Sequence, residues 1–258
     1  MLEKFKAAKA KEIERLKRLE REAGLPEPFT GPRPKFSRAL YANGPGAVIA
    51  EYKRASPSKG EINATLLPGD VASQYAKAGA AALSVLTEET YFKGSLKFLN
   101  AMTGPGLPLL RKDFIFHPLQ IRETAAFPAS ALLLIARMLE GANELGEFLG
   151  LTQDLGLEAV TEVFDEADLK MARMAGAKII QVNNRDLDTL SVSLNVSRRM
   201  IQEKRAPEIW ISASGVQTGS DIKGLANLGF DAVLIGTSLM AGGGPGEALR
   251  EMIREART

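Results

Sequence analysis

The alternation of apolar and helical segments constrains the fold of this chain more than any other feature. From Ala47 onward, eight short apolar runs alternate with helical patterns, spaced about 20 to 35 residues apart. The runs are AVIAEYK, AALSVLTE, LPLLRKD, SALLLIA, LEAVTEV, KIIQVNN, EIWISAS and DAVLIGTS. Continuous rather than alternating apolar character indicates parallel strands that are covered on both faces. Eight such units predict an α/β protein with a closed (β/α)8 TIM barrel, rather than a doubly wound sheet of five or six strands.

The first 46 residues follow a different pattern. Residues 2–22 form a charged helical segment with a narrow apolar stripe, and the Gly- and Pro-containing segment at 24–36 follows as a linker. The stripe consists of Leu2, Phe5, Ile13, Leu16 and Leu19. We predict an N-terminal helical extension over residues 1–46, packed on a barrel over residues 47–258 that forms a single domain.

Composition excludes several classes of protein. Lysine and arginine (33) nearly balance aspartate and glutamate (31), so no nucleic-acid partner is expected. No apolar stretch approaches the roughly 20 residues of a membrane helix, and the N-terminus lacks the apolar core of a signal peptide, so we expect a cytoplasmic protein without a membrane partner. The sequence does not indicate an oligomeric state; we favour a monomer.

Proton transfer in this chain must rely on a short set of side chains. Cysteine is absent and His117 is the only histidine, which argues against thiolate nucleophiles, Ser-His-Asp triads and His–Cys metal sites. We therefore assign acid–base chemistry to Lys, Glu, Asp or Tyr. His117 precedes Pro118 and is predicted to begin the helix after the third strand, without a chemical role.

Polar residues stand where an inert barrel would place apolar ones, at the carboxyl ends of the strands. They are Glu51 and Lys53 (first strand), Lys112 (third), Glu162 (fifth), Asn183 and Arg185 (sixth), and Ser212 and Ser214 (seventh). Strand ends of a TIM barrel meet at one mouth, so Glu51, Lys53, Lys112 and Glu162 should share one cavity. Burial and mutual pairing can prepare such a mixed cluster for proton transfer near neutral pH.

Two further signals concern the ligand. The segments SASGV and IGTSLM follow the seventh and eighth strands, the usual phosphate-binding loops of this fold, and Ser56 in SPSKG could contact the same anion. Phe92 and Phe114, near the ends of the second and third strands, could form flat walls for an aromatic substrate. Tyr52 and Trp210 have the opposite strand parity and should pack under helices.

Seven segments together resemble the signature segments of the indole-3-glycerol phosphate synthase family, in order and at the matching strands. They are VIAEYKRASPSKG, LSVLTEETYFKGS, PLLRKDFIFHPLQI, LEAVTEVFDEADL, VNNRDLDT, SASGV and DAVLIGTSLM. The resemblance implies a carboxy-lyase of tryptophan biosynthesis, which closes the ring of 1-(2-carboxyphenylamino)-1-deoxyribulose 5-phosphate with loss of carbon dioxide and water. It implies no metal or organic cofactor, and a phosphorylated aromatic small molecule as substrate.

The resemblance also implies residue roles. Lys112 resembles the general acid of the condensation and Glu162 the general base of the dehydration, while Lys53, positioned by Glu51, would pair with the substrate carboxylate. Asn183 and Arg185 resemble residues that hold substrate hydroxyls and the lysine network. Phosphate and ribulose contacts match Ser56, Ser214, Gly215, Gly236 and Thr237, and apolar walls match Phe92, Phe114, Leu133, Leu187 and Leu234.

This sequence departs from the family pattern at four positions. Ala213 stands where many relatives have Glu, Gln181 replaces a usual Gly, Phe164 a usual His, and Tyr52 a usual aliphatic residue. Gln181 has the parity of Asn183 and is expected to crowd the barrel interior. Two alternatives stay open: another phosphosugar barrel, such as a phosphoribosylanthranilate isomerase that would need a Cys and Asp pair, and a non-catalytic scaffold barrel.

Overall fold

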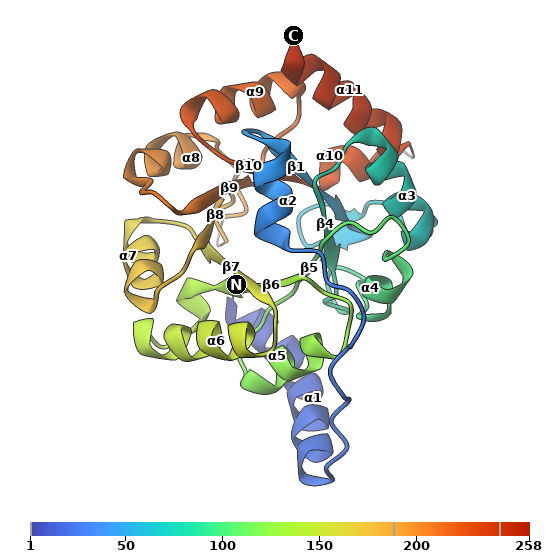
Figure 1. Ribbon diagram of the computed structural model, residues 1–258, viewed down its shortest axis with the longest axis vertical. Coiled ribbons are helices and arrows are strands. Elements are labelled where there is room, and N and C mark those ends of the chain that lie inside the picture. Colours follow the sequence, from blue (N-terminus) through green and yellow to red (C-terminus); the bar gives the residue numbers. More distant parts are fainter. Residues whose placement is uncertain (1, 188, 243) are drawn as a thin grey trace.

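Eight parallel strands close into a barrel in the computed structural model, which describes residues 2–187, 189–242 and 244–258 (Figure 1). Neighbouring strands follow the order β1-β10-β9-β8-β7-β6-β5-β4. The strands are β1 (Ala47–Tyr52), β4 (Ala82–Leu86), β5 (Leu109–Lys112), β6 (Ala131–Ile135), β7 (Glu158–Val163), β8 (Ile179–Asn183), β9 (Ile209–Ala213) and β10 (Ala232–Ile235). The predicted (β/α)8 barrel is confirmed. Met1, in the predicted N-terminal extension, lies outside the described residues.

Helices surround the barrel and follow its strands (Figure 1). The α-helices are α1 (Leu2–Arg21), α2 (Phe36–Asn43), α3 (Pro68–Ala78), α4 (Lys97–Ala101), α5 (Pro118–Ala125), α6 (Ala142–Asp154), α7 (Glu166–Ala175), α8 (Asn195–Met200), α9 (Gly219–Leu228), α10 (Thr237–Met240) and α11 (Pro245–Arg257). Two 3-10 turns, η1 (Ala136–Met138) and η2 (Ile201–Glu203), complete the set. A short antiparallel hairpin of β2 (Ala55–Ser56) and β3 (Gly60–Glu61) occupies the predicted SPSKG turn.

Local sequence signals account for the helix boundaries. The side chain of His117 accepts a hydrogen bond from the Leu119 N–H and so caps α5, which confirms its predicted place at the start of this helix. Glycines in the left-handed conformation end three other helices, because glycine adopts positive φ without a steric penalty. These are Gly79 after α3, Gly176 after α7 and Gly229 after α9.

Alternation along the strands divides the apolar side chains between two cores. The core inside the barrel contains Ile49, Leu110 and Ile211. On each strand, the residues directly before and after these point outward and pack against the helices. Burying each such aliphatic side chain contributes about 1.5–3 kcal/mol. Tyr52 and Trp210 are fully buried in the outer core, as their strand parity predicts. None of the helices in the described ranges is both long and apolar enough to span a bilayer.

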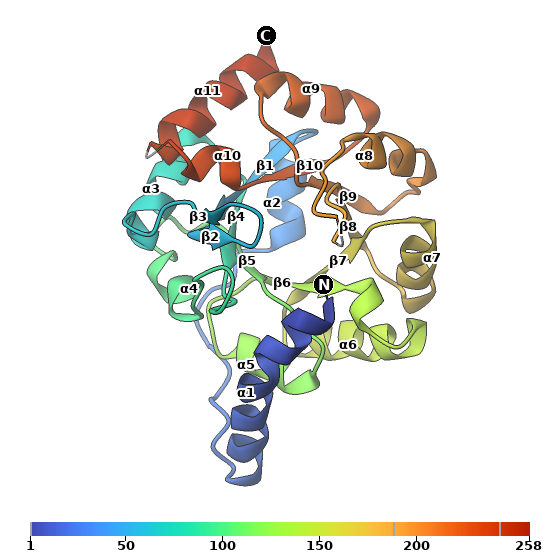
Figure 2. The ribbon, with the colours of Figure 1, turned by 180° about the vertical axis from the view of Figure 1, so that it is seen from behind.

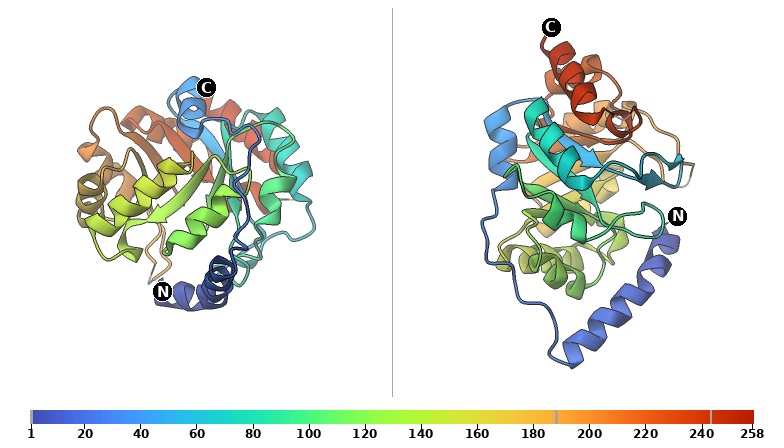
Figure 3. Two further views of the ribbon diagram at one scale, coloured as in Figure 1. Left: turned by 60° about the horizontal axis from the view of Figure 1, so that its bottom comes forward. Right: turned by 90° about the vertical axis from the view of Figure 1, so that its right-hand side faces the viewer.

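The N-terminal segment contacts both ends of the barrel. Figure 2 shows the start of α1 on the side of the β2–β3 hairpin, and Figure 3 shows the following segment leading to α2 on the opposite side. The carboxylate of Glu158, at the start of β7, accepts the Phe36 N–H of α2 at 2.6 Å. On the predicted apolar stripe of α1, Phe5, Ile13 and Leu16 are buried. One end of the barrel is thus closed by α2, and the other lies beside α1.

Candidate active site

The carboxyl ends of the strands surround a cavity with two adjoining lobes, with empty volumes of about 710 Å³ and 1140 Å³. Apart from Ser212, every residue predicted for the site lines one or both lobes. Ser56, Phe92, Phe114, Leu133 and Leu187 line the apolar lobe; Glu51, Gly215, Leu234, Gly236 and Thr237 line the polar lobe; Lys53, Lys112, Glu162, Asn183, Arg185 and Ser214 line both. Residues from all eight barrel strands or their following loops therefore meet in one place, as parallel barrel geometry requires.

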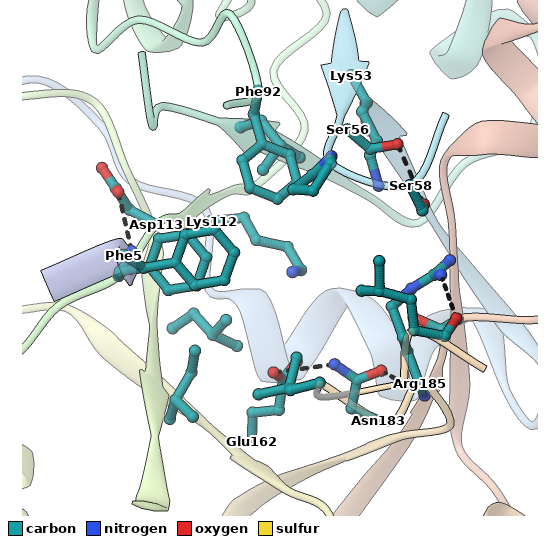
Figure 4. Close-up of a pocket in the computed structure, with 18 residues that line it drawn as sticks. Phe5, Lys53, Ser56, Ser58, Phe92, Lys112, Asp113, Glu162, Asn183 and Arg185 are labelled. Carbon is teal, nitrogen blue, oxygen red and sulfur yellow. Dashed lines mark hydrogen bonds between the residues drawn. The ribbon is translucent and has the colours of Figure 1, made fainter. Parts of the chain in front are cut away.

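Three phenylalanines form one wall of the apolar lobe (Figure 4). Phe5 of α1 stacks on Phe114 with ring centroids 4.0 Å apart and planes inclined by 12°. The Phe92 ring lies 6.0 Å from that of Phe114 and 6.3 Å from that of Phe5. From the sequence, Phe5 was predicted only as part of the apolar stripe of α1 and not as a wall of the cavity. The signal in the sequence that could have indicated this role is an aromatic residue in the first turn of α1.

A buried ionic cluster fixes α1 against β5 behind this wall. Lys9 Nζ lies 2.6 Å from Asp113 Oδ1 and 2.7 Å from Glu12 Oε2. The fully buried Arg111 contacts Asp113 at 2.9 Å and Glu123 at 3.6 Å. Asp113 stands between Lys112 and Phe114 in the chain, so the cluster ties α1 to the strand end that carries both cavity residues. This cluster was not predicted from the sequence, because buried charge pairs leave no periodic signal.

Lys53 and Glu51 form a close pair in the cavity. Lys53 Nζ lies 3.6 Å from Glu51 Oε1, and the other Glu51 oxygen accepts a hydrogen bond from Ser84 at 3.3 Å. Burial lowers the pKa of Lys53, Glu51 opposes this, and the positive charges of Lys112 and Arg185 lower it further. This lysine is therefore a better proton donor than a lysine in water.

Gly236 makes room for the same carboxylate. A Cβ atom at this position would lie 2.4 Å from Glu51 Oε1 and 3.0 Å from the carboxyl carbon of Glu51. Such a contact would force the carboxylate, and with it the paired lysine, to move. Gly236, directly after β10, is thus needed to leave space for Glu51, and it also lines the polar lobe.

Glu162 is held by amides rather than by a cation. Its Oε1 accepts from Asn183 Nδ2 at 3.1 Å and its Oε2 from Gln181 Nε2 at 2.5 Å (Figure 4 shows the Asn183 bond). Gln181 is fully buried, so the expected crowding is accommodated by a hydrogen bond to the carboxylate. Within the described residues, no carboxylate oxygen lies within 4.0 Å of Lys112 Nζ. Figure 4 shows the Lys112 side chain extended into the cavity.

The end of β9 corrects one expectation from the sequence, because Ser212 has the parity of the outward-facing Trp210. Ser212 was predicted at the mouth with Ser214, but it points outward, is fully buried, and its hydroxyl lies 2.8 Å from that of Ser197 in α8. Ser214 lines the cavity because the chain leaves the strand with positive φ at Ser214 (68°) and Gly215 (88°). At Gly215, a Cβ atom would lie 2.8 Å from Val192, in addition to the strain of positive φ.

The charge of the polar lobe suits an anionic ligand. Two carboxylates face an excess of cationic groups there: Glu51 and Glu162 against Lys53, Lys59, Lys112 and Arg185. In the described part of the chain, no group of three or more His, Cys, Asp or Glu side chains could hold a metal ion. The arrangement combines ammonium groups and a carboxylate for proton transfer with a surplus of positive charge for binding.

Known proteins share both the sequence and the fold. The profile of the family described as Indole-3-glycerol phosphate synthase matches residues 2–252. The indole-3-glycerol phosphate synthase of Carboxydothermus hydrogenoformans is 44% identical over 214 residues, covering 82% of this chain and 81% of that protein. The enzyme of that name from Aquifex aeolicus is 45% identical over 221 residues, covering 84% and 85%.

More distant solved structures share the barrel alone. A thiamine phosphate pyrophosphorylase from Pyrococcus furiosus aligns with a TM-score of 0.60 at 11% identity, over 82% of this chain and 95% of that chain. A mandelate oxidase aligns with a TM-score of 0.60 at 16% identity, over 82% and 73%. The fold therefore occurs with several chemistries, and the family is shown by the sequence match over nearly the whole chain. The chain belongs to the indole-3-glycerol phosphate synthase family.

Proposed function

We propose that this protein converts 1-(2-carboxyphenylamino)-1-deoxyribulose 5-phosphate to indole-3-glycerol phosphate, with loss of carbon dioxide and water, in tryptophan biosynthesis. The observation that carries the proposal is the meeting of Lys53, Lys112, Glu162 and Asn183 where an aromatic lobe adjoins a cationic lobe. The substrate has the same two parts, an aromatic ring with a carboxylate and a phosphorylated sugar chain. Family membership supports the same reaction.

Lys112 serves as the general acid of the condensation in this proposal. Attack by an electron-rich ring carbon on the carbonyl needs a proton on the carbonyl oxygen, and a positioned ammonium can supply it. Lys112 reaches into both lobes without a carboxylate of the described residues within 4.0 Å, so no ion pair there must break before it contacts substrate. Lys53, positioned by Glu51, holds the carboxylate that later leaves as carbon dioxide.

Glu162 serves as the general base of the dehydration. It is buried, it lines both lobes, and its two amide donors fix the direction of its oxygens. Asn183 belongs to the same hydrogen-bonded unit. Its side-chain Oδ1 accepts the backbone N–H of Arg185 at 3.0 Å, and its Nδ2 donates to Glu162. The Arg185 guanidinium, whose Nη1 donates to the Leu190 carbonyl at 3.1 Å and which lines both lobes, is assigned to the hydroxyls of the substrate chain.

The two ends of the substrate are assigned to the two lobes. Phe92, Phe114, Leu133 and Leu187 enclose the ring of the substrate in the apolar lobe. Leu234 bounds the polar lobe. The phosphate is placed at the rim of small residues after β9 and β10, with a contribution from the hairpin after β1. The residues proposed for these contacts are Ser56, Ser214, Gly215, Gly236 and Thr237.

A single assay tests the proposal. The purified chain is mixed with 1-(2-carboxyphenylamino)-1-deoxyribulose 5-phosphate, and formation of the indole ring is followed by fluorescence. We expect turnover without added metal or organic cofactor. Consumption of phosphoribosylanthranilate alone would favour the isomerase, and inertness toward both substrates would favour a scaffold.

We also propose how the chain is divided into domains. We assign residues 1–46 to a helical extension and residues 47–258 to one catalytic barrel domain, because β1 begins at Ala47. Phe5 gives the extension a place in the site itself. A monomeric state and a cytoplasmic location stay predictions from the sequence.

A further inference from the structure

Gln181 lies below the cavity and reaches the proposed base from inside the barrel. It is the third residue of β8, pairs in register with Glu162 of β7, and is fully buried. It lines neither lobe, so a bound substrate would not touch it. Its Nε2 nevertheless donates to Glu162 Oε2 at 2.5 Å, the shorter of the two amide bonds to this carboxylate.

The orientation of both amides follows from their partners. A carboxylate only accepts hydrogen bonds, so the nitrogen of Gln181 must face Glu162. The orientation of the Asn183 amide is fixed separately, because its Oδ1 accepts the backbone N–H of Arg185 at 3.0 Å. Each oxygen of Glu162 therefore has one neutral donor, and the carboxylate cannot rotate without losing both bonds.

The other end of the Gln181 amide has no such partner. Its Oε1 is buried and makes no hydrogen bond to any described residue. Burying an unpaired carbonyl oxygen costs free energy, so the side chain is not optimised for stability. The bond to Glu162 is the only side-chain hydrogen bond that the structure gives Gln181 among the described residues.

We propose that Gln181 is a positioning residue, which acts through Glu162 by holding its carboxylate in the orientation that accepts a proton. This inference rests on the proposed function, in which Glu162 is the base. A hydrogen bond from a neutral amide to a charged carboxylate is charge-assisted, so it favours the ionised form over the protonated form. The charged residues that line the two lobes with Glu162 are Lys53, Lys59, Lys112, Arg185, Glu51 and Asp113, and among the described residues none of them forms an ion pair or hydrogen bond with Glu162 that could replace the amide.

The test replaces Gln181 by methionine, which keeps the length of the side chain and removes the donor. In the full chain, we expect Gln181→Met to lower kcat about tenfold and to leave KM within about threefold. The acidic limb of the pH profile of kcat should move to higher pH, because the ionised base has lost a donor. The urea midpoint should stay close to that of the parent protein, since the unpaired Oε1 is removed too.

A second variant and a control separate this role from a structural one. Gln181→Glu keeps the shape but sets a carboxyl group beside Glu162, and should move the acidic limb to still higher pH. Thr161→Val removes another buried unpaired oxygen, from the outward-facing residue before Glu162, and should leave kcat and the pH profile unchanged. The inference is overturned if the parent protein turns over and both Gln181 variants keep its kcat and pH profile. Absence of turnover in the parent would instead overturn the proposed function.

Discussion

The contact between Lys9 and Asp113 should stabilise the docked position of α1 strongly. The Lys9 side chain is 4% exposed and that of Asp113 is fully buried, so solvent screens their 2.6 Å contact little. Lys9→Met keeps most of the aliphatic stem and removes the charge, leaving the Asp113 carboxylate buried with Arg111 as its remaining cation. We expect a loss of about 3–5 kcal/mol in the free energy of unfolding, as for other buried ion pairs that lose one partner. Undocking of α1 would limit the loss by admitting water to Asp113.

The pH dependence of stability reports on all the groups around Asp113, of which Lys9 is one. Burial raises the pKa of Asp113, but the charges of Lys9 and Arg111, with hydrogen bonds from Lys9 and Thr87, outweigh it and lower the pKa from 3.8 to about 2. An acid whose pKa is lower in the folded state adds stability above its unfolded pKa. This stability, about 2 kcal/mol, is lost as the pH falls from about 5 toward 2. Lys9→Met should therefore flatten the pH dependence of stability in this range.

Urea denaturation at neutral and acidic pH measures both effects. The matched control is Lys6→Met, also on α1, because the Lys6 ammonium lies 3.7 Å from Glu3, whose side chain is 88% exposed, and 5.9 Å from the centre of the Phe116 ring. Such a surface pair contributes about 0–1 kcal/mol. If Lys9→Met unfolds at the same urea concentration as Lys6→Met and keeps the acid sensitivity of the parent protein, the buried pair does not stabilise the fold as argued.

Three further predictions concern the site. Lys112→Ala should lower kcat about 10²- to 10⁴-fold with a smaller change in binding, measured by indole fluorescence; unchanged turnover would remove the assignment as acid. Glu51→Gln should move the basic limb of the kcat/KM profile to lower pH, because burial already lowers the pKa of Lys53 and Glu51 is the group that raises it; a limb that stays in place would contradict this pairing. Phe5→Leu should raise KM about fivefold and spare kcat, since the stacked wall with Phe114 is lost; an unaltered KM would exclude α1 from the binding site.

The sequence was sufficient to predict the barrel and the residues that meet at its mouth. The continuous apolar runs and their spacing identify parallel βα units, because only strands covered on both faces tolerate such runs. Alternation with period two then places Glu51 with Lys53, and Lys112 with Phe114, on the cavity side. These inferences depend on local geometry, which residue order determines.

Other features depend on which elements pack together, and only the tertiary structure decided them. Phe5 enters the cavity because α1 docks beside β5, a contact between residues more than a hundred positions apart that no periodicity encodes. Ser212 shares the parity of Trp210 and points outward, whereas parity fails beyond the strand, where positive φ turns Ser214 toward the cavity. The bond from Gln181 to Glu162 likewise requires the register of two neighbouring strands. Residue order sets the direction of a side chain along its own strand, whereas its partner is set by the packing of the whole barrel.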